Sequence, residues 1–193
     1  MRKLLAVLFV LVVSTSFAFS KITIPAPKTD QEFIVKLGIQ PQSTIKLNGD
    51  SENTNIGTSL GVEYFKYLGN VIAVGAGATY DLPRNFRDTY AGSVSFLPLY
   101  VGIKARTPLH GLDDNYGFIT GRIGYSAFIP SNDFMRSTSG GLYYSGGVGI
   151  SVSYLVIEAI YSIENFSYKS VTDNSSNSTY ASTISLYVGF KFE

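Results

Sequence analysis

The last strand-like segment of the chain alternates without a break between two kinds of residue. One set is apolar and the other is mostly polar: Ile184, Leu186, Val188, Phe190 and Phe192 against Thr183, Ser185, Tyr187, Gly189 and Lys191. A β-strand projects successive side chains to opposite faces, so this segment predicts a strand with one continuous apolar face. The pattern suits the closing strand of a β-barrel.

The first residues have the organisation of an export signal. Arg2 and Lys3 carry positive charge, residues 4–13 are all apolar, and small residues allow cleavage after Ala18 or Ser20. Ten apolar residues are too few for a membrane-spanning helix, which needs about 20 to cross roughly 30 Å of hydrocarbon. We expect residues 1–20 to be a cleaved signal peptide, residues 21–31 a short periplasmic segment, and residues 32–193 the folded domain.

Composition restricts the remaining possibilities. The 193 residues suffice for one domain. Charged residues make up 15 % of the chain, against roughly 25 % in soluble proteins. The formal charge of +1 gives no reason to expect a nucleic-acid partner. The chain has no cysteine, which excludes disulfides, thiolate catalysis and thiolate metal sites.

The rest of the chain favours an all-β fold, because apolar residues recur with a period of two in eight segments. These are residues 32–39, 59–65, 72–80, 96–104, 119–127, 142–153, 157–164 and 183–192. The connections 40–55, 81–89, 130–140 and 169–179 are polar and mostly long, and those after the second and sixth segments are tight. The connection 106–115 is an exception, since it is about as long as the polar ones.

Short periplasmic turns and longer outer loops are typical of transmembrane barrels, whose tilted strands need about 9–11 residues. We therefore predict an eight-stranded antiparallel up-and-down transmembrane β-barrel with both ends in the periplasm.

Charge indicates which face looks inward. Eight charged residues lie opposite the apolar rows: Glu32, Lys36, Glu63, Lys104, Arg122, Glu158, Glu164 and Lys191. A Lys or Arg facing lipid at mid-membrane costs about 2–4 kcal/mol, so we expect all eight inside the barrel. The lumen of such a barrel holds side chains but hardly a channel. We expect a neutralised ion-pair network that groups Glu32 with Glu158 and Lys191, and Glu63 with Lys104 and Arg122.

Small and aromatic residues complete this picture. Gly75 and Gly77 would leave room for Tyr100 and Phe96 in the interior. Aromatic rings are expected in belts at the two membrane interfaces, with Tyr64, Tyr67, Tyr154, Phe190 and Phe192 at the periplasmic one and Tyr80, Tyr90, Phe128, Tyr144 and Tyr168 at the outer one. The rival interpretation, a secreted lipocalin-like carrier, would place apolar residues inside and charges outside.

Two segments carry a resemblance to a known family. Residues 97–106 (LPLYVGIKAR) and 116–125 (YGFITGRIGY) resemble the middle of the small outer-membrane barrels, a superfamily with OmpA/OmpX-type, OmpW-type and opacity-type members. The resemblance implies an outer-membrane location, periplasmic chaperones, and a barrel-assembly machinery that reads the apolar row of residues 184–192. The family's signal normally ends in an aromatic residue, whereas Glu193 follows Phe192 here.

Few residues could support catalysis or metal binding. His110 is the only histidine, and the topology places it in a periplasmic turn, away from where barrel lipid A deacylases carry their Ser, His and acid. Asp113, Asp114 and Asn115 could offer oxygens to a hard cation, but acidic turns are usually solvated. We therefore expect no catalytic residue, no metal and no cofactor.

The sequence favours a structural or surface-interaction role, with the outer loops making the contacts. The alternative is an OmpW-like barrel that binds or passes small apolar solutes, and a third possibility is a lipid-modifying enzyme that depends on His110. We expect outer-membrane lipid as surroundings, an unidentified surface ligand, and a monomer.

Overall fold

The computed structural model describes residues 30–47, 50–85, 93–109, 115–131, 135–170 and 176–192. These residues form ten strands: β1 (Gln31–Leu47), β2 (Asp50–Asn53), β3 (Gly57–Tyr67), β4 (Ile72–Asn85), β5 (Ser93–Pro108), β6 (Tyr116–Ser131), β7 (Met135–Ser139), β8 (Gly141–Val152), β9 (Leu155–Ser170) and β10 (Ser176–Phe192). In this part of the chain there is no helix of the length and hydropathy that a membrane crossing requires.

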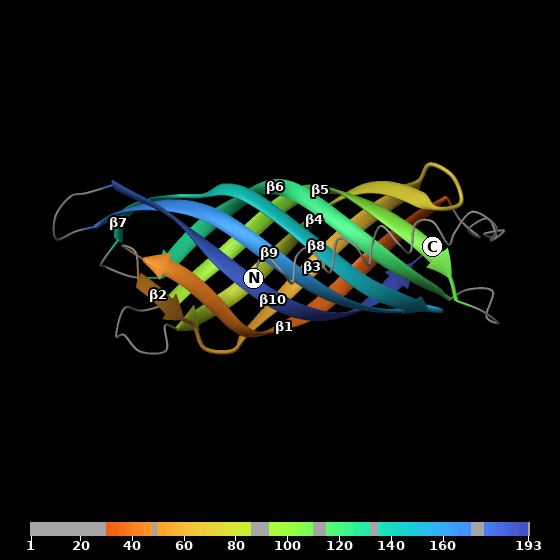
Figure 1. Ribbon diagram of the computed structural model, residues 1–193, viewed down its shortest axis with the longest axis horizontal. Coiled ribbons are helices and arrows are strands. Elements are labelled where there is room, and N and C mark those ends of the chain that lie inside the picture. The colour runs from red at the N-terminus through yellow and green to blue at the C-terminus, as the bar shows by residue number, and fades with distance from the viewer. Residues whose placement is uncertain are drawn as a thin grey trace, which may run out of the picture.

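Eight of the strands close into a barrel (Figure 1). The order around the wall is β1, β3, β4, β5, β6, β8, β9 and β10, and β10 pairs with both β9 and β1. All neighbouring strands are antiparallel. Closure removes the unpaired edges that an open sheet would expose. The predicted all-β, eight-stranded antiparallel barrel is therefore confirmed.

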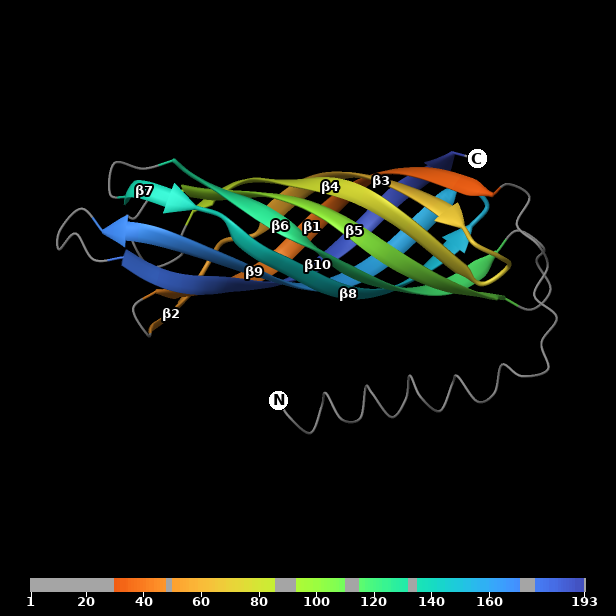
Figure 2. The ribbon, with the colours of Figure 1, turned by 90° about the horizontal axis from the view of Figure 1, so that it is seen from above.

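The two ends of the barrel differ. One end, called the terminal end here, carries Asp30 and Phe192 and the short turn at Ser153, which adopts a left-handed backbone with φ of 53°. The opposite end, called the loop end, carries the short strands β2 and β7 (Figure 2). β2 pairs with β1, and β7 pairs with β9.

The barrel strands are longer than the sequence indicated. β1 and β10 each contain 17 residues, and β5, β6 and β9 each contain 16. The predicted loops 40–55 and 130–140 contain β2 and β7, and residues 176–179 of the predicted loop 169–179 pair with β9. Backbone hydrogen bonds hold these extensions, so they need no apolar alternation and look like loops in sequence.

Two prolines explain why the strands seemed to end early. Pro41 lies in the predicted connection 40–55 and Pro83 in the predicted connection 81–89. Pro41 instead lies between Ile39 and Gln42, where the pairing with β10 shifts register. Pro83 lies between Asp81 and Arg84, where the pairing of β4 with β5 shifts. Both are β-bulges, which accept a residue without a backbone donor and let the strand continue.

The faces of the wall are inverted relative to a soluble barrel. On β10, Leu186 and Phe190 are 46 % and 61 % exposed, whereas Tyr187 and Lys191, which directly follow them in the chain, are 5 % and 4 % exposed. The same alternation runs along β3, where every second residue is buried. The outer surface is thus a belt of apolar side chains, which contradicts the lipocalin-like interpretation.

Two of the predicted interface aromatics lie elsewhere. Tyr67 and Phe128 are 7 % and 6 % exposed and point into the lumen. Both share the phase of inward residues, Tyr67 with Glu63 and Phe128 with Ser126, so their place near a strand end was a misleading signal. Tyr64, Tyr80, Tyr144 and Tyr154 are exposed on the outside. Tyr90 lies outside the described residues.

Candidate functional site: the charge network of the lumen

All eight charged residues singled out in the sequence point into the barrel. Their side chains are buried, and the most exposed of them, Arg122 and Lys191, reach 4 %. The cause is local, because each residue occupies the inward phase of a strand that alternates with period two. The structure distributes the eight over three levels of the lumen.

A cluster around Arg122 occupies the middle of the lumen. Arg122 donates from Nε to Glu63 Oε1 at 2.7 Å, and from Nη2 to both carboxylate oxygens of Glu158 at 2.7 and 2.9 Å. Lys36 donates to Glu63 at 2.8 Å and lies 3.5 Å from Glu158. Tyr100 donates its hydroxyl to Glu63 at 2.8 Å. Two acids and two bases thus share one neutral group of contacts from β1, β3, β6 and β9.

A second contact group lies nearer the terminal end. Lys104 Nζ pairs with Glu32 Oε1 and lies 4.2 Å from the centroid of the Phe65 ring. The other oxygen of Glu32 accepts hydroxyl hydrogen bonds from Tyr116 at 2.7 Å and from Tyr67 at 3.3 Å. Charge-assisted bonds of this kind are stronger than those between neutral groups.

The partners differ from the grouping that strand order suggested. Glu32 pairs with Lys104 of β5, and Glu158 pairs with Arg122 of β6 and Lys36 of β1. Lys191 lies 5.2 Å from the centroid of the Tyr116 ring. The contacts cross the lumen between distant strands, because strand tilt brings together residues at different positions along their strands. The expected contact between Glu63 and Arg122 is present.

A third polar group, toward the loop end, contains Glu164 together with Gln40, Asp81 and Arg84, which the sequence did not single out. Gln40 donates to Asp81 Oδ1 at 2.8 Å and accepts from Arg84, and Ser126 donates to Glu164 Oε2 at 3.4 Å. Asp81 and Arg84 are buried and add one charge of each sign. Asp81 continues the inward phase of Gly77 and Thr79, so alternation could have found it. Arg84 is out of phase because of the bulge, so alternation could not.

Apolar layers lie on both sides of the Arg122 cluster. Toward the terminal end lie Ile34, Phe65, Tyr67, Ala73, Tyr116, Phe118 and Val156. At the loop end lie Ile45, Val94, Phe96, Phe128, Phe166 and Ala181. The Phe166 ring lies 4.4 Å from that of Phe128 and 5.6 Å from that of Phe96, measured between centroids. Inward glycines admit large rings, with Tyr100 over Gly77 as expected and Phe65, rather than Phe96, over Gly75.

The network neutralises charge and fills space in the lumen. Among the described residues, no group of three or more His, Asp or Glu side chains is arranged to hold a metal. His110, Asp113 and Asp114 lie outside these residues, so their sequence-based interpretation stays a prediction. Asn115 is described, and its Oδ1 accepts the backbone N–H of Ser153 at 2.9 Å. That contact joins the residue before β6 to the turn between β8 and β9.

The apolar row predicted as an assembly signal lies in the described part of the chain, whereas the predicted signal peptide lies outside it. Ile184, Leu186, Val188, Phe190 and Phe192 form one exposed apolar row on β10. Their recognition by an assembly machinery stays a prediction. Residues 1–29 and Glu193 lie outside the described residues, so the signal peptide and its cleavage also stay predictions.

Comparison with known proteins establishes the fold. No protein-family model matches the sequence, and no curated protein matches it either. Neisserial surface protein A is similar with a TM-score of 0.55 and 10 % identity, over 85 % of this chain and 98 % of that one. Outer membrane protein OprG from Pseudomonas aeruginosa has a TM-score of 0.50 and 14 % identity, over 89 % and 100 %.

The attachment invasion locus protein Ail of Yersinia pestis is similar as well, with a TM-score of 0.50 and 19 % identity over 85 % of this chain and all 100 % of that one. At such low identities the likeness concerns the fold alone. The fold of this chain is that of the small eight-stranded outer-membrane barrels.

Proposed function

We propose that this protein is an integral outer-membrane barrel whose loop end makes contacts at the cell surface. The observation that carries the proposal is a change in the outward face along single strands. On β10 the outward row runs from Phe192 to Ile184 in apolar residues and continues toward the loop end as Ser182, Tyr180 and Ser178. A wall that only had to span lipid would end where the apolar row ends.

The neighbouring strands change in the same way. On β9 the outward row passes from Tyr161 and Ile163 to Asn165 and Ser167. On β1 it passes from Ile39 to Thr44 and Lys46, and Thr44 Oγ1 donates to Asn53 Oδ1 of β2 at 3.2 Å. The three strands therefore extend beyond the apolar belt, and their outward side chains there are mostly polar. Rigid scaffolds that present polar loops are where recognition usually resides.

The filled lumen supports a contact role over that of an open pore. The ion pairs of Arg122 occupy the middle of the lumen, and apolar layers lie on both sides of these ion pairs. A solute on that path would have to displace buried ion pairs, and breaking such pairs is costly.

The test separates contact from transport. The β4–β5, β6–β7 and β9–β10 connections are shortened one at a time, and assembly is checked by the shift between unheated and boiled samples on a gel. Adhesion of the producing cells and uptake of apolar solutes are then assayed separately. We expect adhesion to fall with uptake unchanged for at least one variant. Loss of uptake with adhesion untouched in every assembled variant would refute the contact role.

A second candidate, binding of small apolar solutes, is favoured by one observation. The apolar layer with Phe128 and Phe166 adjoins a part of the wall where pairing is incomplete. Within the described residues, β6 pairs with β8 only as far as Ser126, and β7 pairs with β9 alone. A solute entering there would reach the rings of Phe96, Phe128 and Phe166. In that case Phe128→Ala would change apolar solute uptake while adhesion stayed normal.

A further inference from the structure

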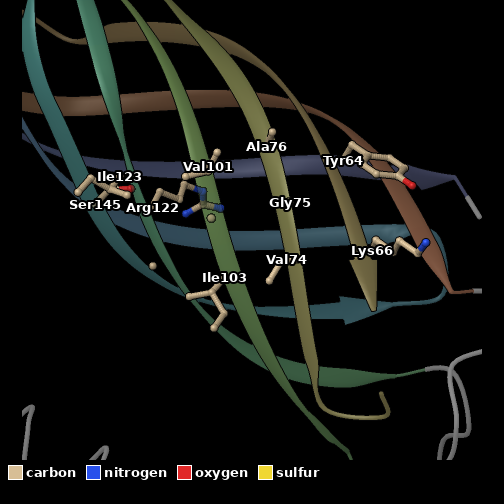
Figure 3. Close-up of a pocket in the computed structure, with 12 residues that line it drawn as sticks. Tyr64, Lys66, Val74, Gly75, Ala76, Val101, Ile103, Arg122, Ile123 and Ser145 are labelled. Carbon is tan, nitrogen blue, oxygen red and sulfur yellow. The ribbon is translucent and has the colours of Figure 1, made fainter. Parts of the chain in front are cut away.

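The outer wall carries a hollow that neither the charge network nor the loop end explains. It has a volume of about 880 Å³ and lies over β3, β4, β5 and β6, with Val74, Val101 and Ile103 among its lining residues (Figure 3). Lys66 and Tyr64 lie at one side of it, on β3. The remaining lining residues are apolar apart from Ser145 of β8 and Arg122, whose side chain is buried toward the lumen.

Small residues in two neighbouring rows of the wall create the hollow. One row runs in register through Tyr64, Ala76, Val101 and Ile123, and the next through Lys66, Val74, Ile103 and Gly121. Ala76 and Gly121 are the small members. A Cβ added to Gly121 would meet only Ile103 Cγ2, at 3.7 Å, so the space above this glycine is open to the outside.

Lys66 gives the hollow a polar end. It is the last residue but one of β3 and is exposed on the outer face, so it lies where the apolar belt meets the terminal end. Tyr64 beside it donates its hydroxyl to Gln31 at 2.9 Å, as an interfacial tyrosine does. The only acids of β3, β4, β5 and β6, Glu63 and Asp81, are buried in the lumen. Among the described residues of these four strands, no carboxylate lies on the outer face beside Lys66.

We propose that this hollow binds one phospholipid of the periplasmic leaflet. An acyl chain lies across Val74, Ile103 and Gly121, and the lipid phosphate pairs with Lys66 Nζ. A cation at the interface end of an apolar hollow complements a molecule with an anionic head and an apolar tail. The inference rests on the proposed membrane location but is independent of the role of the loop end.

The test is native mass spectrometry of the barrel in detergent with added phosphatidylglycerol, phosphatidylethanolamine or lipopolysaccharide. We expect one phospholipid to stay bound to the wild-type barrel. Lys66→Gln should weaken the binding of phosphatidylglycerol about fivefold, the factor that corresponds to one interfacial lysine. Gly121→Leu should abolish the bound species by filling the hollow.

Matched controls lie outside the hollow. Gly146 neighbours Gly121 in register, and a Cβ there meets only Thr120 O, at 3.9 Å. Gly146→Leu and Lys46→Gln should therefore bind lipid like the wild type. Ala76→Leu replaces Gly121→Leu if that variant does not assemble.

If Lys66→Gln and the hollow-filling variant both retained as much lipid as the wild type, the proposal would be overturned. Retention of lipopolysaccharide but of neither phospholipid would overturn it as well. A barrel that is soluble without detergent would instead refute the membrane location itself.

Discussion

At the scale of single residues, Arg122 connects more of the lumen than any other residue described above. It contacts Glu63 and Glu158 at once, and its Nη1 donates to Thr120 at 2.8 Å. Lys36 contacts the same two acids but cannot offer a planar fork of donors. Loss of Arg122 would leave two buried carboxylates to share one ammonium.

Arg122→Leu should therefore lower the free energy of unfolding by about 3–5 kcal/mol, the typical cost of breaking a buried ion pair by removing one partner. Lys66→Gln, which removes an exposed charge from the outer wall, should change it by at most about 1 kcal/mol. Urea unfolding in lipid vesicles measures both. Equal stabilities of the two variants would mean that the network contributes little.

Two glycines that differ in the face they occupy provide another residue-level test. A Cβ at inward-facing Gly75 would overlap the carbonyl oxygen of Tyr64 and the ring of Phe65, whereas Gly146 faces open space outside. Gly75→Val should thus prevent assembly or cost about 3 kcal/mol or more, and Gly146→Val should be tolerated. The heat shift on a gel reports assembly. Normal assembly of Gly75→Val would show that this face is not packed as described.

At the scale of elements, the sequence predicted about half to two-thirds of most strands and missed their continuation. Period-two alternation located the apolar belt because lipid and lumen impose opposite demands on successive residues. Beyond the belt both faces are polar or mixed, as in residues 176–183, and alternation vanishes while pairing persists. The bulges at Pro41 and Pro83 added a false ending to two strands.

The extension of β10 can be tested by hydrogen exchange. Residues 178–183 pair with β9 across their whole length, so their amides should exchange about as slowly as those of residues 184–188. The amides of β2, which pairs with β1 alone, should exchange faster. Deuterium uptake measured by mass spectrometry gives both rates. Fast exchange throughout residues 178–183 would instead place the start of the strand near residue 183, as the sequence predicted.

The candidate site was predictable in membership but not in pairing. Inward phase follows from a residue and its immediate neighbours, so Glu32, Lys104 and the others could be assigned to the lumen. The contact between Lys104 and Glu32 joins residues 72 positions apart, and it depends on the tilt and stagger of the closed wall. No local signal in the sequence encodes that stagger.

At the scale of the whole molecule, polar and apolar levels alternate along the lumen. Planar-bilayer recordings of the purified barrel should accordingly show at most rare and small openings. Arg122→Leu should not convert these into a steady current, since the apolar layers around Phe65 and Phe128 remain. A steady large conductance in the wild type would be incompatible with a filled lumen.

The central structural feature is the inverted wall, which places apolar side chains outside and charged side chains inside. Because the chain has no cysteine, single cysteines can carry spin labels without background labelling. Labels at Ile184, Leu186 and Val188 in a barrel reconstituted in vesicles should collide often with oxygen dissolved in lipid, and labels at Ser185 and Tyr187 should be shielded. The opposite phase, or free access of a water-soluble nickel chelate to Leu186 and Val188, would contradict the inverted barrel.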